Sequence, residues 1–437
     1  MKLVQITPGA GGMYCGNCFR DNALVTAWRR LGVEALMVPL YLPMTLDEAS
    51  TANGTPTFFG GINVYLDQKF GWYRRAPAWL RRLADAPGLL RWAAGRAAKT
   101  QAADVGDVTV SMLQGEHGLQ SRDLEEMVQW LAGSGAPDAV FLSNAMLAGF
   151  ARRLREVLGS RVVCFLQSEE TYLDSMPEPW RSRSWEALRQ RVSDVDLWVS
   201  PSRYFADRMA ARLDLPPARI AIVPNGILLD GYDRLPARSR KAPGDPLTLG
   251  FFARMCADKG LDLVVDAFIA LRSGGRHPGL TLKVGGGCGP GDESYVSALR
   301  TRLEAVGLGG AVTFHPNVSR EGKIAFYADC DVLCVPARMS EAFGLYMIES
   351  MAAGTPLVQP AVAAFPEILG DTGGGVLYGA NTATGLAAAL EPLVAAPGRL
   401  RDLGDAGRQV VMARYSDAAM ARRVVEALGS LLAKPSG

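Results

Sequence analysis

The sequence lacks several features that would point to particular classes of protein. No stretch of its 437 residues approaches the ~18 consecutive apolar residues of a membrane-spanning helix, so we expect none. Cysteine is scarce and odd in number, seven residues scattered from position 15 to 334, which argues against a disulfide framework and favours a reducing compartment. The chain has 46 Lys and Arg residues and 44 Asp and Glu residues, so neither sign of charge dominates. The overall charge therefore does not indicate a nucleic-acid partner. The three histidines, at 117, 277 and 315, are scattered, and we interpret them as structural or surface residues.

The start of the chain, MKLVQITPGAGG, carries one Lys and a very short apolar run before its glycines. A secretory leader needs a longer apolar region, so we interpret this segment as a first strand followed by its loop. The expected localisation is cytoplasmic.

Length and apolar pattern together predict two α/β domains. The chain exceeds the ~250 to 300 residues at which single cores stop growing, and its short apolar runs alternate with helix-length segments, as in βαβ units of a parallel sheet. Strands are expected at Leu3–Thr7, Ala35–Pro39, Ala139–Ser143, Val162–Leu166, Leu197–Ser200, Ile220–Val223, Leu247–Ala253, Leu280–Gly285, Ala311–His315, Asp331–Pro336 and Thr355–Pro360. We predict an N-terminal domain at 1–233, a linker at 234–246, a C-terminal domain at 247–410 and a C-terminal helix at 411–437.

A helical insertion is expected at about 67–100, where Trp and Leu residues alternate with arginines over Lys69–Lys99. Such a basic and aromatic mixture suits a lipid headgroup interface, which would place the protein at the inner membrane surface or against a lipid-linked acceptor. The other interpretation is a helical pair that packs its aromatics on the first domain and exposes its arginines.

The segment Ser340–Pro356, SEAFGLYMIESMAAGTP, is the most informative in the chain. A helix entered through a glycine presents free N–H groups and the positive end of its dipole, so the amides of Phe343, Gly344 and Leu345 suit a phosphate. Glu341 and Glu349 stand eight residues apart, at most ~12 Å along a helix, and would bracket a long ligand. A hydrolytic carboxyl pair would lie ~5 to 9.5 Å apart across one bond.

Two cations follow the first strand of the second domain, in the sequence FFARMCADKG. Arg254 and Lys259 can neutralise a diphosphate as it leaves, which a bound metal does in other enzymes. Two D-x-D matches, Asp194 to Asp196 and Asp329 to Asp331, precede strands and are explained as helix-to-strand turns. We therefore predict that no metal is required.

The region around Glu341 and Glu349 resembles the E-x7-E region of family 4 glycosyltransferases, which are retaining enzymes of the GT-B fold. The resemblance implies two doubly wound Rossmann-like domains, with a C-terminal helix returning to the first and the acceptor on the first domain. It implies a UDP- or GDP-linked sugar as donor substrate and no cofactor. Glu341 would face the sugar hydroxyls, the amides of Phe343 to Leu345 the diphosphate, and Glu349 the ribose. The catalytic set implied is Glu341, Arg254 and Lys259.

Other segments match the family in part. FFARMCADKG resembles its G-R-x4-K-G pattern with Ala253 in place of glycine. The resemblance adds Gly11 and Gly12 from a glycine-rich loop and Val318 as a backbone contact to the nucleobase. The family's histidine after a first-domain strand is absent, and Glu169 or Glu170 is the substitute that the sequence offers.

Several alternatives stay open. A nucleotide-sugar epimerase or a phosphorylase has similar architecture, and a non-catalytic donor-binding protein would keep the same residues. A dinucleotide-dependent oxidoreductase is disfavoured, since Tyr14 replaces the last glycine of G-x-G-x-x-G. Cys15 and Cys18 form a single C-x-x-C, which is too few ligands for a zinc site. The acceptor and the oligomeric state are not fixed by the sequence.

Overall fold

The computed structural model describes residues 1–9, 16–41, 50–52, 55–56, 58–59, 105–239, 241–273, 275 and 277–432. The expected insertion at 67–100 and three residues of interest, Gly11, Gly12 and Cys15, lie outside the described residues. The chain forms two compact units, Met1–Pro224 with Ala418–Gly437, and Asn225–Asp417. The structure thus assigns 225–233 and 234–246 to the second unit, whereas the sequence-based division placed them in the first domain and in a linker.

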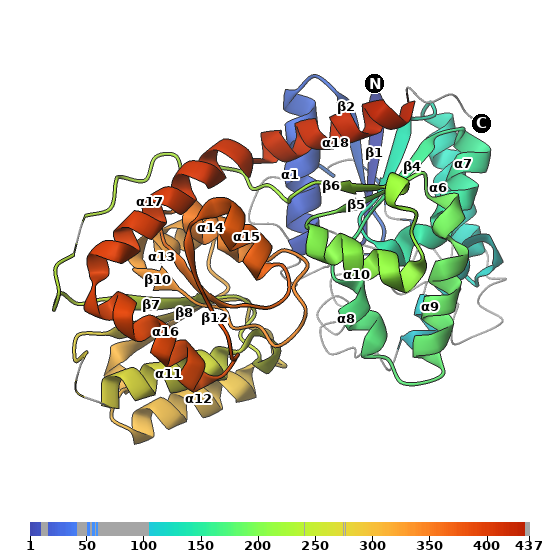
Figure 1. Ribbon diagram of the computed structural model, residues 1–437. Helices are drawn as coiled ribbons and strands as arrows, with labels where there is room; N and C mark the ends of the chain where they lie inside the picture. The colour runs from blue at the N-terminus through green and yellow to red at the C-terminus, as the bar shows by residue number, and fades with distance from the viewer. Residues whose placement is uncertain are drawn as a thin grey trace. The chain divides into compact units, whose positions relative to one another are not determined.

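The first unit contains a parallel sheet of six strands in the order β2-β1-β3-β4-β5-β6 (Figure 1). Its strands are β1 (Lys2–Thr7), β2 (Glu34–Pro39), β3 (Ala139–Leu142), β4 (Arg161–Phe165), β5 (Leu197–Ser200) and β6 (Ile220–Ile222). Its helices are α1 (Gly16–Arg30), α5 (Gly106–Gln114), α6 (Ser121–Gly133), α7 (Ala151–Leu158), α8 (Glu169–Asp174), α9 (Trp180–Gln190), α10 (Arg203–Leu213) and α18 (Asp417–Leu432), with 3-10 turns at Gly115–His117, Ala145–Phe150, Val192–Asp194 and Pro217–Arg219.

The second unit contains another parallel sheet of six strands, in the order β12-β11-β10-β7-β8-β9. Its strands are β7 (Thr248–Phe252), β8 (Thr281–Gly286), β9 (Val312–Pro316), β10 (Val332–Leu333), β11 (Leu357–Pro360) and β12 (Gly375–Tyr378). Its helices are α11 (Leu261–Ser273), α12 (Glu293–Ala305), α13 (Arg320–Asp329), α14 (Leu345–Ala352), α15 (Phe365–Thr372), α16 (Ala383–Ala395) and α17 (Pro397–Arg414), with 3-10 turns at Ala257–Lys259 and Gly309–Ala311. The prediction of two doubly wound α/β domains is confirmed.

The last helix, α18, completes the hydrophobic core of the first unit. Its residues Met420, Val424 and Leu428 are buried in one cluster with Trp28 of α1 and Phe141 of β3. Figure 1 shows α18 lying beside α1 and the strands of that sheet. The predicted return of the C-terminal helix to the first domain is therefore confirmed.

The range expected for the C-terminal helix, 411–437, contains the end of one helix and the whole of the next. Helix α17 ends at Arg414 and α18 begins at Asp417, because the backbone between them pairs with the segment after Pro224. Ile227 donates its N–H to the carbonyl of Tyr415 at 2.9 Å, and its carbonyl accepts from Asp417 at 2.8 Å. A β-carbon on Gly226 would lie 2.2 Å from the carbonyl oxygen of Ser416, which explains the glycine at this crossing.

The strand order of the second unit fixes where a ligand is expected. Strands β7 and β10 are neighbours, but the chain leaves β7 toward β8 and β10 toward β11, on opposite sides. Ligands of doubly wound sheets bind at such a switch point, outside the carboxyl ends of the strands. The loops after β7 and β10 carry Arg254 and Lys259, and Glu341, respectively.

Candidate functional site

The loop after β7 and the segment before α14 are joined by an ion pair. The Lys259 ammonium donates to Oε1 of Glu341, and the two side chains are 20% and 11% exposed. Gly260, which follows with φ +74°, lies so close to the end of β10 that a β-carbon would be 2.2 Å from the carbonyl oxygen of Pro336. The glycine after Lys259 is thus required by this close approach. Lys259 and Glu341 are 82 positions apart in the sequence and were predicted to act together, and the structure places them in direct contact.

Arg254 is held by a carboxylate that the sequence did not assign to the site. Its Nε lies 3.2 and 3.1 Å from the two oxygens of Asp292, and its Nη2 lies 3.0 Å from Oδ1. The Arg254 side chain is 63% exposed and that of Asp292 only 7%. The hydrogen bond that Arg254 donates to Asp292 raises the pKa of Arg254 further above its ordinary value, so the guanidinium is a permanent cation at the sheet edge.

Helix α14 begins at Leu345, directly after Gly344 in the left-handed conformation, φ +87°. The first amides of a helix carry the positive end of its dipole, and here that of Met347 already donates to the carbonyl of Gly344 at 3.0 Å. Phe343 is buried, and its ring lies 6.2 Å from that of Tyr415. The Tyr346 hydroxyl is buried. Its burial is the main cause that raises the pKa of this phenol, and the charge of the nearby Glu341 carboxylate is the second cause. The Glu341 carboxylate thus lies beside a neutral phenol and a paired lysine.

Glu349 lies within α14 and is held at both oxygens. Lys323 donates to its Oε1 at 2.8 Å and Tyr327 to its Oε2 at 2.9 Å, both from α13. Burial, then the charge of Glu349, raises the pKa of Tyr327, which keeps that hydroxyl a donor. An ionised carboxylate has about four lone-pair sites, so these two bonds do not exhaust its capacity to accept hydrogen bonds.

The glycine cluster after β8 is a fixed loop, in contrast to the flexible alternative that its composition allows. Asn317, with φ +53°, accepts a hydrogen bond from the N–H of Cys288 at 3.0 Å and donates to its carbonyl at 2.8 Å. The Asn317 N–H donates to Gly286, and that of Met255 to Gly287. Val318, the predicted nucleobase contact, directly follows this clamp and is half-buried.

The sequence missed the partners of the predicted site residues: Asp292, Lys323, Tyr327 and Arg338. Arg338 forms two bonds to the Asp262 carboxylate, at 2.7 and 2.6 Å, and donates to the carbonyl of Ala257 at 2.5 Å. These contacts fix the 3-10 turn that carries Lys259. Arg254, Lys259, Glu341, Gly344 and Glu349 are all grouped around the carboxyl edge of this sheet, while their roles toward a donor stay predictions.

The two candidates for the missing histidine of the first unit have different surroundings. Glu169 is buried and accepts hydrogen bonds from the N–H groups of Ala145, at 2.9 Å, and Gln167, at 2.8 Å. Burial raises its pKa to about 7. Glu170 lies 3.3 Å from Nε of Arg208 on α10. Glu169 therefore joins the loops after β3 and β4, and Glu170 pairs helix α8 with α10.

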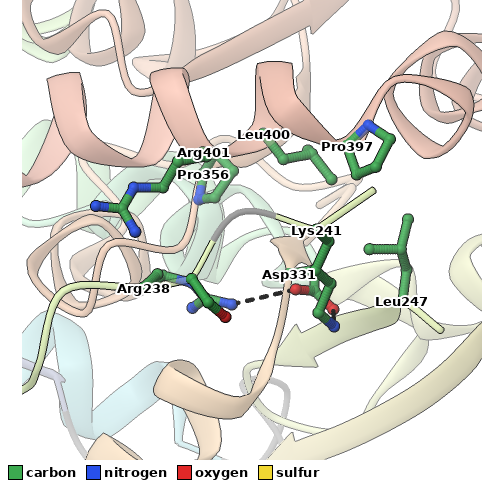
Figure 2. Close-up of a pocket in the computed structure, with 9 residues that line it drawn as sticks. Arg238, Lys241, Leu247, Asp331, Pro356, Pro397, Leu400 and Arg401 are labelled. Atoms are coloured by element: carbon green, nitrogen blue, oxygen red, sulfur yellow. Dashed lines mark hydrogen bonds and ion pairs between the residues drawn. The ribbon is translucent and has the colours of Figure 1, made fainter. Parts of the chain in front are cut away.

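The carboxylates of the D-x-D matches are engaged in ion pairs. Figure 2 shows Arg238 and Lys241 converging on Asp331, which also accepts from the N–H of Thr248 at 2.8 Å. Asp329 pairs with Lys283 at 2.8 Å. In the first unit, Asp194 pairs with Arg152 and Arg191, and Asp196 with Arg161. Within the described residues, no three His, Cys, Asp or Glu side chains gather in a way that could hold a metal ion.

The cavity beside Asp331 in Figure 2 is separate from the switch point, since Asp331 directly precedes β10 and Leu247 precedes β7, at the amino ends of the strands. Its volume of about 20 Å³ has room for about one water. Among the helices that the structure describes, none has both the length and the apolarity of a membrane span.

Two protein-family models match the chain. "Glycosyl transferases group 1" matches residues 235–410, and "Glycosyltransferase Family 4" matches residues 91–230. The D-inositol 3-phosphate glycosyltransferase of Mycobacteroides abscessus is 34% identical over 195 residues, covering 43% of this chain and 42% of the relative. That of Stackebrandtia nassauensis is 32% identical over 236 residues, covering 52% of each. The matched region thus spans about half the length of these curated relatives.

A longer match has lower identity. The GDP-mannose-dependent alpha-(1-6)-phosphatidylinositol monomannoside mannosyltransferase of Mycobacterium tuberculosis is 27% identical over 333 residues, covering 74% of this chain and 79% of the relative. Among solved structures, the sucrose-phosphate synthase of Thermosynechococcus elongatus aligns with a TM-score of 0.70 at 18% identity, over 99% of both chains. An Anabaena protein solved in complex with UDP-glucose aligns with a TM-score of 0.63 at 14% identity, over 98% of this chain and 100% of that one. These likenesses establish the fold.

Proposed function

We propose that this chain, which belongs to the family 4 glycosyltransferases of the GT-B fold, transfers a sugar from a nucleotide-diphosphate sugar to an acceptor hydroxyl. The observation that carries the proposal is the contact between Lys259 and Glu341. It brings the cation for a diphosphate and the carboxylate for a sugar together at the switch point of the second sheet.

The chemistry of this edge suits a leaving diphosphate. As the bond between the anomeric carbon and the phosphate oxygen breaks, negative charge grows on the diphosphate. Arg254, Lys259 and the first amides of α14 are donors fixed in advance, and such preorganised donors supply most of the stabilisation at many active sites. The acceptor hydroxyl forms the new bond, and its proton passes to an oxygen of the leaving phosphate. We infer retention of the anomeric configuration and no required metal.

The donor is proposed to be GDP- or UDP-linked. A relative is named as GDP-mannose-dependent, and a protein of the same fold was solved with UDP-glucose. Glu349 is proposed to bind the ribose and Val318 the base. Gly11 and Gly12, outside the described residues, are proposed to approach the diphosphate from the first domain.

The acceptor is proposed to bind the N-terminal domain, taken as 1–233, with the donor on 247–410. Several relatives are named for inositol phosphate or phosphatidylinositol acceptors, so inositol-containing compounds form the first panel to test. Contact of 69–99 with a membrane surface or a lipid-linked acceptor belongs to the same proposal, as does a cytoplasmic location.

The test is transfer from GDP- and UDP-sugars to this panel, with product detected by mass and its anomeric configuration by NMR, with and without EDTA. The expected result is a retained-configuration product that EDTA leaves unchanged and that Glu341→Gln abolishes. Asp329→Asn serves as control, because it removes a carboxylate from an ion pair that precedes β10, away from the carboxyl edge.

Other outcomes would identify the alternatives. Isomerised donor without acceptor indicates an epimerase, and phosphate-dependent cleavage of a glycan indicates a phosphorylase. Tight binding of a donor without turnover on any acceptor indicates a donor-binding protein.

A further inference from the structure

The carboxylate of Asp292 is matched to one guanidinium, that of Arg254. Three nitrogen–oxygen distances of 3.0 to 3.2 Å join the two groups, through Nε and Nη2 of the arginine. The contact is asymmetric in burial, since the side chain of Asp292 is 7% exposed and that of Arg254 is 63% exposed. A buried group fixed in the protein therefore holds a group that faces outward.

Asp292 is itself rigidly placed. It directly precedes α12, its Oδ2 accepts from the N–H of Gly289 at 3.1 Å, and its own N–H donates to the Gly289 carbonyl at 2.8 Å. The loop before it is clamped by the two hydrogen bonds between Asn317 and Cys288. Gly286 at the loop start, φ +118°, has the Ala253 carbonyl oxygen 1.9 Å from where a β-carbon would stand. The start of the loop is thus fixed against the chain that leads from β7 to Arg254, and Cys288 within it is fixed against Asn317.

The geometry leaves one edge of the arginine available. A guanidinium carries five N–H donors in a planar fork. Asp292 takes the Nε hydrogen and one hydrogen of Nη2, which leaves both Nη1 hydrogens and the second of Nη2. Those three point away from the buried carboxylate, and a flat pair of donors matches two oxygens of a phosphate.

We propose that Asp292 is a positioning residue that fixes the plane of the Arg254 guanidinium, so that its remaining N–H edge meets the diphosphate of a bound nucleotide. The inference rests on the proposed function and goes beyond it, because it assigns the control of the leaving-group cation to the loop after β8. Asp292 does not touch the nucleotide and acts through Arg254 alone.

A double-mutant cycle tests this with the full chain. Calorimetric affinities for GDP and UDP are measured for the unmodified protein, Asp292→Asn, Arg254→Met and the double variant. Asp292→Asn is expected to raise the Kd of the diphosphate that binds by about tenfold, the size of one charge-assisted hydrogen bond. In the Arg254→Met background the same change is expected to have no effect, since nothing is left to position. The affinity for GMP or UMP, which lack the second phosphate, is expected to change less.

Asp329→Asn is the matched control, since it removes a carboxylate from a 2.8 Å ion pair in the same unit. An Asp292→Asn affinity equal to that of the unmodified chain overturns the proposal. So does an equal loss in the Arg254→Met background, which would assign Asp292 a role independent of the arginine. If Asp292→Asn unfolds the second unit, Asp292→Glu replaces it, because this variant keeps the negative charge but displaces the guanidinium of Arg254. An unchanged affinity for the diphosphate in Asp292→Glu also overturns the proposal. If the unmodified chain binds neither diphosphate, the proposed function itself fails.

Discussion

The charged side chains at the carboxyl edges of the two sheets differ in how deeply they are buried. At the switch point of the first sheet, between β1 and β3, Arg20 and Asp21 form a 2.8 Å ion pair in which both side chains are fully buried. Arg20 also lies 3.9 Å above the ring of Phe165 and donates to the carbonyl of Ser143. At the switch point of the second sheet, by contrast, the Arg254 side chain is 63% exposed.

The difference shows that the sheet topology determines where a ligand site can lie, whereas the exposure of the charged side chains there determines whether they can contact a ligand. The described part of the first edge binds its charges to one another inside the core, so they maintain the fold. The second edge anchors Arg254 on a buried carboxylate and leaves most of its side chain exposed, so this charge is accessible to a ligand. The predictions below separate these two roles.

The largest effect is expected from Arg20→Met in the first unit. It leaves the Asp21 carboxylate in the core without its guanidinium, and breaking a buried pair in this way costs about 3–5 kcal/mol. Chemical denaturation should show this loss for the first unit, while nucleotide binding below the transition is retained. Arg30→Met, at an exposed position of the same helix, should stay within about 0.5 kcal/mol of the unmodified protein. Equal stability of the two variants would mean that the buried pair does not maintain the fold.

Lys259→Met is expected to act on turnover and not on stability. Loss of one preorganised donor at the leaving group should lower kcat by about 10²–10³-fold, or about 2.7–4 kcal/mol in the barrier. Steady-state kinetics of sugar transfer measure it. Lys283→Met is the matched control, since Lys283 is also 20% exposed and paired with a carboxylate. Similar losses of turnover in both variants would contradict the role given to Lys259.

Glu169 is expected to make the stability of the first unit depend on pH. Its folded pKa of about 7 is raised above the value of 4.5 for an exposed carboxyl, so the folded chain keeps a proton that the unfolded chain releases. Stability therefore falls as pH rises from 4.5 to 7, by up to about 3 kcal/mol, and is level above that window. Glu169→Gln should flatten this dependence in melting curves recorded from pH 5 to 8. A slope unchanged in the variant would assign the effect to another group.

The smallest effect is expected from Gly344→Ala at the start of α14. The left-handed conformation, and a β-carbon 3.2 Å from the Tyr346 ring, should cost about 1–2 kcal/mol and weaken diphosphate binding. Gly370→Ala in α15, where a β-carbon meets nothing within 4 Å, should instead stabilise by about 0.5–1 kcal/mol. Thermal melts with and without GDP or UDP compare the two. A destabilised Gly370→Ala and an unaffected Gly344→Ala would remove the strain argument.

Local pattern was sufficient to predict most of the sheets. All eleven expected strands overlap observed strands, because each is a short apolar run followed by a turn. The twelfth, β12, was missed because Gly375–Tyr378 is brief and opens with a glycine. Strand β10 is shorter than predicted, at Val332–Leu333, since the chain turns away after it toward Gly260 and α14.

The candidate site divides in the same way. Arg254, Lys259, Glu341 and Glu349 could be predicted as candidates because their spacing in the sequence is itself a local pattern, and their roles toward a donor stay predictions. Their partners Asp292, Lys323 and Tyr327 could not, because those contacts depend on which elements are neighbours, a property of the whole sheet order. The break at Tyr415 is non-local too, since it depends on pairing with Ile227.

The return of α18 to the first unit makes the core of that unit depend on residues synthesised after the second unit. Domains generally fold as units, the N-terminal one first, as the chain leaves the ribosome. Here Met420, Val424 and Leu428 belong to the core of the first unit, and they follow the whole of the second unit in the chain. The second unit, 225–417, is complete before them, and its two ends are already joined by the bridge between Ile227 and Ser416. The core of the first unit can therefore be completed only after residues 225–417 have been synthesised.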